Sequence, residues 1–158
     1  MLPFLFALAA CGPTLANAAE LDPSSVAVSP DLVARYEVVR LALVQDKLDE
    51  SHTAARELAA ANAADQPVVT AANAVAASPD LTAARVAFGE LSRVLIPRVA
   101  STSPAPKVLV YHCPMFQGYA WWFQSKAGIA NPYMGIAMPA CGSETSVKAA
   151  VKAASGAP

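Results

Sequence analysis

The sequence has no strong charge of either sign: its formal net charge is -1, and 15% of its residues are charged. A chain without a basic surface does not hold the phosphate backbone of nucleic acid, so we expect no nucleic-acid partner. Histidine and cysteine are scarce, with two and three residues. The sequence contains no Cys-x-x-Cys pair and no recognisable Ser-His-Asp set, so we expect a binding protein rather than an enzyme.

Long apolar runs are also missing after the N-terminus. No uncharged apolar run beyond the leader approaches the roughly 18 residues that a membrane-spanning helix needs. The hydrophobic content of 55% comes largely from 36 alanines, which favour helices. We therefore expect one mainly helical domain over residues 27–158.

The N-terminal stretch MLPFLFALAACGPTLANAAE is typical of an export signal, which we place at 1–18. Two processing sites remain open. Ala16-Asn17-Ala18 fits cleavage after Ala18, whereas Leu8-Ala9-Ala10-Cys11 resembles a bacterial lipobox with a lipidated cysteine. In both cases we expect the protein in the periplasm or cell envelope, with membrane contact only through a lipid anchor.

Apolar residues spaced by three and four predict a helical scaffold over 27–97. Ser29 and Pro30 open the first helix. A turn near Asp46 leaves open whether the following segment is a second helix or a continuation. A shorter helix is expected over 66–77, and another begins after Ser78-Pro79-Asp80 and is expected to stop at Pro97. Such short helices bury little surface alone, so we predict an antiparallel three- or four-helix bundle. His52, among alanines and charged residues, is expected to be solvated or capping.

The composition changes at a Pro- and Ser-rich connector over 98–106. Seven of the eleven aromatic residues and every methionine except Met1 lie in the following segment, 107–142. KVLVYH predicts a strand, YAWWFQ a second strand or a short helix, and NPYMG a turn. A last helix and tail are expected over 143–158, with Ser143 as the N-cap. The expected fold is thus a helical bundle with a short strand and loop segment before a C-terminal helix.

The sulfur residues of this segment suggest a metal site. If the chain stays extended after the strand, Cys113 and Met115 share one face and His112 lies on the other. Met138 and Cys141 are three residues apart, so one turn can bring them together. Thiolates and thioethers are soft ligands that favour Cu(I), or Ag(I), over zinc and the hard cations.

Simpler interpretations remain open beside the metal site. A disulfide between Cys113 and Cys141 would close a loop of about 28 residues and stabilise the fold by about 3 kcal/mol. Methionines among aromatic rings often only fill a core, and Trp121 and Trp122 often only pack.

The stretch YHCPM…NPYMGIAMPACG resembles a small exported helical domain of uncharacterised function, found alone or fused to the adaptor subunits of copper and silver efflux pumps. The similarity is specific over 108–142 and fainter in YEVVRLALVQDKL and AFGELS. It implies that the metal-site residues are Cys113, Met115, Met138 and Cys141. It implies a structural turn formed by Asn131, Pro132, Tyr133 and Gly135. Two additional candidate ligands that are not fixed parts of the pattern are His112 and Met134.

The resemblance favours an envelope protein that buffers Cu(I) or Ag(I), or passes it to a copper efflux adaptor or another copper carrier. The alternative is a protein-interaction module that a Cys113–Cys141 disulfide staples and that binds no metal. A thiol oxidoreductase is a third hypothesis, which the missing Cys-x-x-Cys disfavours.

Overall fold

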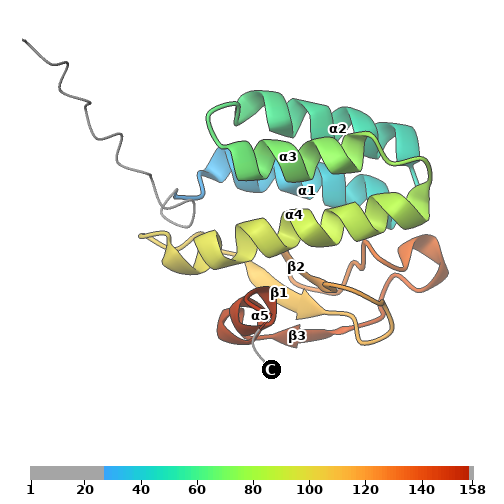
Figure 1. Cartoon of the computed structure of the whole chain (residues 1–158). Coiled ribbons are helices and arrows are strands. Elements are labelled where there is room, and N and C mark those ends of the chain that lie inside the picture. Colours follow the sequence, from blue (N-terminus) through green and yellow to red (C-terminus); the bar gives the residue numbers. More distant parts are fainter. Residues whose placement is uncertain (1–26, 157–158) are drawn as a thin grey trace, which may run out of the picture.

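Four consecutive helices form the N-terminal part of the fold in the computed structural model, which describes residues 27–156. The predicted export signal and Cys11 lie outside the described residues. The helices are α1 (Pro30–Val44), α2 (Leu48–Ala61), α3 (Gln66–Ala76) and α4 (Leu81–Ser101), and each packs on the next. Figure 1 shows them stacked above a small sheet and α5 (Val147–Ala154), with α4 next to the sheet. The chain is mainly helical, as expected.

Polar caps explain where the helices begin. The Ser29 side chain accepts a hydrogen bond from the Leu32 amide, and Asp65 and Asp80 cap α3 and α4 in the same way. Asp46, with a φ of 57°, lies between α1 and α2, so the second segment is a separate helix. None of the helices in the described residues is long and apolar enough to cross a membrane.

The expected stop at Pro97 is wrong, because α4 continues through it to Ser101. Proline removes only its own N–H donor, and the residues around it are held by the core. Ile96 and Val99 are buried, and the buried Arg98 guanidinium forms an ion pair with Asp65. These contacts offset the missing backbone hydrogen bond.

A three-stranded antiparallel sheet covers one side of α4. Its strands are β1 (Leu109–His112), β2 (Trp121–Gln124) and β3 (Ser143–Thr145), in the order β2-β1-β3. The strand predicted in KVLVYH is therefore present, and YAWWFQ contains a strand rather than a helix. The strand does not continue to Met115, because Pro114 and Met115 form a turn directly after Cys113. The face assignment based on an extended chain therefore does not apply.

The C-terminal segment also differs from the expectation. Ser143 does not cap a helix but begins β3, where it pairs with His112. The reason is that the outer edge of β1 would otherwise expose unpaired N–H and C=O groups. The backbone of residues 143–145 forms hydrogen bonds with these groups. The helix starts four residues later, and the Ser146 side chain caps it by accepting from the Ala149 amide.

The helices and the sheet share one hydrophobic core. Tyr36 of α1 stacks on Phe88 of α4 and on Phe123 of β2, and its hydroxyl shares a 2.7 Å hydrogen bond with that of Ser92. Gly89 lets α4 approach the chain before β2 closely, since a Cβ there would lie 2.6 Å from the Tyr119 carbonyl oxygen. The sheet is thereby fixed directly on α4.

Candidate metal centre

The sheet brings the two cysteines of the described chain together. Cys113 directly follows β1 and its amide donates to the Ala120 carbonyl at 3.0 Å, which extends the pairing with the chain before β2. Cys141 lies two residues before β3, whose Ser143 pairs with His112. Both thiols are free, and their Sγ atoms are 3.8 Å apart although 28 residues separate them in sequence.

Gly142 allows this close approach. Its φ is +132°, a conformation that side-chain-bearing residues rarely adopt. A Cβ at this position would lie 2.8 Å from the His112 carbonyl oxygen and 3.1 Å from the Trp122 ring. A glycine next to Cys141 therefore lets its backbone lie against the end of β1.

The thiol separation fits a shared metal ion. A disulfide needs sulfurs about 2.05 Å apart, which is closer than the 3.8 Å of this pair. With each sulfur about 2.3 Å from one ion, as in zinc–thiolate bonds, the 3.8 Å separation gives an S–metal–S angle of about 110°. A linear complex with the same bonds would need sulfurs about 4.6 Å apart. A bent pair leaves coordination positions for one or two further ligands.

The two thiols differ in their surroundings. The Cys113 side chain is fully buried and that of Cys141 is half-buried. Partial burial, the hydrogen bond with Cys113 and the negative charge of the Cys113 thiolate all raise the pKa of Cys141. The Cys141 thiol therefore tends to keep its proton, and a metal ion that binds this sulfur must displace it.

The candidate thioether ligands lie on exposed segments that flank the thiols in sequence. Met115 is 62% exposed and Met138 is 36% exposed, whereas Met134 is half-buried. The Met138 carbonyl accepts a hydrogen bond from the Cys141 amide at 3.1 Å, so the two residues share a turn. Among the described residues, neither exposed methionine accepts a hydrogen bond from a thiol. The structure thus brings the thiols together and leaves these thioethers at the surface.

His112 has an aromatic partner. Its ring packs against Trp121 with a centroid distance of 4.0 Å and an interplanar angle of 30°, and the side chain is half-buried. Burial lowers the pKa of His112 below its usual value. The other histidine, His52, is half-buried on α2, outside the strand and loop segment. Its Nε2 atom has no hydrogen-bond partner within the described chain.

Aromatic rings pack together near the two cysteines, where Trp122 lies against Gly142 and Tyr133 is close enough to Cys113 to interact electrostatically with it. Trp122 is fully buried, stacks on Tyr111 and meets Tyr133 edge-on, and Phe116 stacks on Tyr133 at 4.6 Å. The Tyr133 hydroxyl donates to the Trp121 carbonyl at 2.6 Å, and burial raises the pKa of Tyr133 well above its usual value. The cysteine pair therefore borders a cluster of buried aromatic rings.

The segment 131–135 is connected to Cys141 by the side chain of Asn131, which is fully buried. The Asn131 carboxamide oxygen accepts from the Tyr133 and Met134 amides, and its NH2 group donates to the Cys141 carbonyl at 2.6 Å. The Asn131 amide also donates to the Pro139 carbonyl at 2.8 Å. The Asn131 side chain therefore joins the 131–135 segment to Cys141.

Charged residues of the helices hold this loop, and no motif in the sequence marks them as part of the site. Arg85 of α4 pairs with Asp46 and donates from Nε to the Pro132 carbonyl at 3.1 Å. Arg40 of α1 donates to the Ala130 carbonyl at 2.9 Å, and Glu37 accepts from the Ser125 amide at 2.5 Å. No local pattern reveals these residues, because these partners are 39 to 90 positions away.

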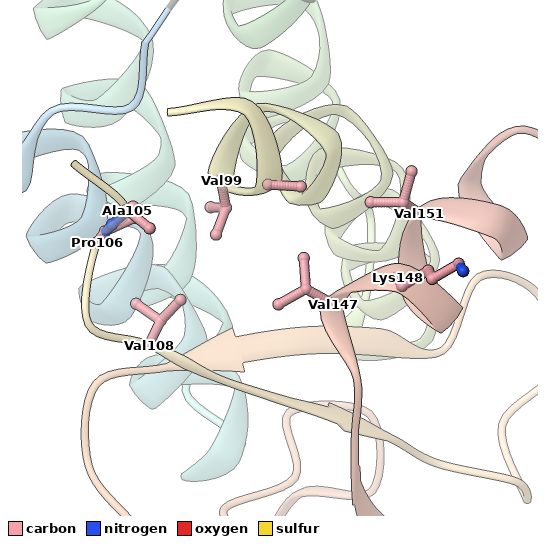
Figure 2. Close-up of a pocket in the computed structure, with 8 residues that line it drawn as sticks. Val99, Ala105, Pro106, Val108, Val147, Lys148 and Val151 are labelled. Atoms are coloured by element: carbon pink, nitrogen blue, oxygen red, sulfur yellow. The ribbon is translucent and has the colours of Figure 1, made fainter. Parts of the chain in front are cut away.

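An apolar groove lies at the other end of β1 from the thiols. Its volume is about 460 Å³, and it is bounded by the end of α4, the connector, the chain before β1 and α5. Figure 2 shows Val99, Val108 and Val147 pointing into it, while the Lys148 amine points away. The groove contains no sulfur residue and is separate from the thiol pair.

The described residues contain no group of three or more His, Cys, Asp and Glu side chains suited to a metal ion. A metal site here therefore depends on the two thiols and on ligands outside that set, such as thioethers. No family model, curated protein or solved structure matches the chain.

Proposed function

We propose that the protein binds Cu(I), or Ag(I), between the thiolates of Cys113 and Cys141, and that it buffers the ion or passes it to a copper efflux adaptor or another copper carrier. The observation that carries the proposal is the 3.8 Å separation of two free thiols. The protein would act in the periplasm or cell envelope, reached through the export signal, and its role would be binding without catalysis.

The chemistry of the donors supports a soft monovalent ion. Two thiolates and a thioether are ligands of Cu(I), whereas zinc structural sites use four Cys or His ligands. Met115 and Met138 flank the thiols and supply thioethers for the remaining coordination positions. His112 and Met134 are the further candidates, and the resemblance noted above implies the same four sulfur ligands.

The segment between the thiols adds little charge to the site. Lys126 is the only charged residue between Cys113 and Cys141. Two thiolates and one Cu(I) carry a net charge of -1, and Lys126 is the one cation that this segment offers to balance it. Selection would rest on the softness of the ligands rather than on charge, which favours Cu(I) over Mg2+ or Ca2+.

An anaerobic titration of the reduced protein with Cu(I), against a competing chromogenic chelator, tests the proposal. We expect one equivalent of Cu(I) bound, and a loss of affinity by orders of magnitude in Cys113→Ser and Cys141→Ser, because a hydroxyl is a hard and poorly ionised donor. Ala140→Ser is the matched control, since it adds a hydroxyl beside Cys141 without removing a thiol. Unchanged affinity in the double serine variant would exclude the site.

The second candidate function is a protein-interaction module that a Cys113–Cys141 disulfide staples. It is supported by the same thiol contact and by the exposed Met115, Ile136 and Met138 side chains around it. A thiol count on native protein isolated without reductant separates the two: a staple leaves no thiol in the mature domain, whereas a copper site leaves two that react after the metal is removed.

A further inference from the structure

We propose that Asp46 and Arg85 are positioning residues that set the distance between the two thiols, by holding the loop that carries Cys141. The meaning of this distance for copper rests on the proposed function. The geometry itself concerns the thiols and is testable without copper.

Arg85 connects the bundle to the loop through two different nitrogens. Its Nη2 pairs with the Asp46 carboxylate, and its Nε donates to the Pro132 carbonyl at 3.1 Å. The Arg85 and Asp46 side chains are only 15% and 27% exposed. A planar guanidinium can serve both acceptors in a fixed geometry, which a lysine ammonium cannot reproduce.

The loop is pressed directly onto this ion pair. Gly135 has a φ of +55°, and a Cβ at this position would overlap both the Asp46 carboxylate and the Arg85 guanidinium. The Gly135 amide donates to the Asn131 carbonyl, which closes the 131–135 turn over the pair. Asp46 also has a positive φ, which is uncommon for a residue with a side chain, so the backbone on both sides of this contact lies in the left-handed region.

Asn131 transmits the position of the turn to Cys141. It precedes Pro132, the residue that Arg85 binds, and its NH2 group donates to the Cys141 carbonyl at 2.6 Å. Three links therefore lead from the bundle to the thiol: Asp46 to Arg85, Arg85 to Pro132, and Asn131 to Cys141.

We call the Asp46–Arg85 ion pair and its hydrogen bond to Pro132 the clamp. The positions of the two cysteines depend on this clamp to different extents. Cys113 is fixed by the β1 ladder and by its own hydrogen bond to Ala120. Cys141 ends a loop from Ser125 to Ala140 whose only regular element is η2 (Gly135–Ala137). Without the clamp the loop gains conformational freedom, and Cys141 spends more time away from Cys113. The effective concentration of one thiol at the other then falls, and a chelate or a disulfide weakens with it.

The test measures that effective concentration in glutathione buffers without copper. In the reaction, the two protein thiols and one glutathione disulfide give the Cys113–Cys141 disulfide and two reduced glutathiones, so protons and electrons balance. Alkylation and mass measurement give the equilibrium constant. All variants are compared where circular dichroism shows them fully folded.

Arg85→Gln should lower the effective concentration at least 10-fold, and Arg85→Lys should restore only part of it. The matched control is Arg98→Gln, which breaks the buried Arg98–Asp65 ion pair of the same bundle. Arg98→Gln should lower the unfolding midpoint and change the effective concentration less than 2-fold. Asp46→Asn and Asp65→Asn form a milder pair of variants for the same comparison if an arginine variant fails to fold.

Equal effective concentrations in wild type and Arg85→Gln would overturn the proposal. The proposal would also be overturned if the effective concentration fell equally in Arg85→Gln and Arg98→Gln, or equally in Asp46→Asn and Asp65→Asn. Failure of the wild type to form the disulfide would overturn it as well, because the thiol contact would then be absent. Cu(I) affinity of the same variants is measured separately. A protein that shows the expected thiol result but binds no Cu(I) would refute the proposed function and leave the clamp intact.

Discussion

The ring of Tyr36 stacks on Phe123 with a centroid distance of 3.9 Å, and this contact joins the first helix to the strand next to the thiols. Both side chains are fully buried. Because the hydroxyl of Tyr36 also bonds that of Ser92 in α4, one residue links α1, α4 and β2. The sheet next to Cys113 is therefore held by the helical core. Because the Tyr36 phenol is titratable, its contribution to stability can be followed as a function of pH.

Stability should fall as the pH rises above about 10, partly through Tyr36. Burial raises the pKa of Tyr36 well above its usual value. The unfolded phenol ionises near pH 10 and the folded one does not, so unfolding releases a proton and this residue removes about 1.4 kcal/mol of stability per pH unit above pH 10. Tyr36→Phe should have a lower free energy of unfolding than wild type at pH 8. This difference in unfolding free energy should shrink by about 1.4 kcal/mol at pH 11.

Urea unfolding at pH 8, 10 and 11 measures this difference. Ser92→Ala is the control, because it removes the same hydrogen bond but keeps the Tyr36 phenol. The difference in unfolding free energy between Ser92→Ala and wild type should therefore not shrink as the pH rises. A constant gap for Tyr36→Phe would show that the phenol ionises in the folded state.

Met115→Leu and Met138→Leu test whether the thioethers bind the ion. Both side chains are exposed, so a volume-conserving change should alter the free energy of unfolding by less than about 0.5 kcal/mol. As ligands, they should lower Cu(I) affinity when replaced, because leucine has no donor atom. Ile136→Leu, at another exposed side chain of the same loop, is the control. Wild-type affinity in both methionine variants would restrict the site to the thiols.

His112→Ala should shift Cu(I) affinity equally at every pH between 5.5 and 7.5. The His112 ring packs against Trp121 with a centroid distance of 4.0 Å and an interplanar angle of 30°, so we expect the imidazole to stay outside the coordination shell of the ion. A bound imidazole would have to lose its proton and would strengthen binding mainly at the alkaline end. A gap between the two affinity curves that widens with pH would identify His112 as a ligand.

Gly142→Ala should weaken both the fold and the thiol contact. The added Cβ would meet the His112 carbonyl oxygen at 2.8 Å, so the Cys141 segment must move away from β1. We expect a loss of about 1–3 kcal/mol in unfolding free energy and a lower Cu(I) affinity. The control is Gly128→Ala, whose φ is also positive, +93°, but whose Cβ would have no atom within 4 Å. Equal losses in the two variants would mean that backbone strain alone explains the effect.

The helices and their starts follow from the sequence, because capping and apolar spacing act over three or four residues. Ser29 begins α1 and Asp65 begins α3 as local hydrogen bonding requires. The gathering of cysteine and methionine after residue 107 likewise marks the candidate site without any structure. What the sequence supplied was the chemistry of the donors and the local elements around them.

Tertiary structure decided which of these residues meet. Pro97 stays helical because the core holds its neighbours, and 143–145 becomes a strand because β1 leaves an edge to pair. The thiol contact depends on Gly142 against His112 and on Asn131 below Cys141, and the loop depends on Arg85, 47 residues before its acceptor Pro132. Such long-range pairings are set by how whole elements pack and leave no local pattern, so only the folded chain shows that two sulfurs 28 residues apart lie within reach of one ion.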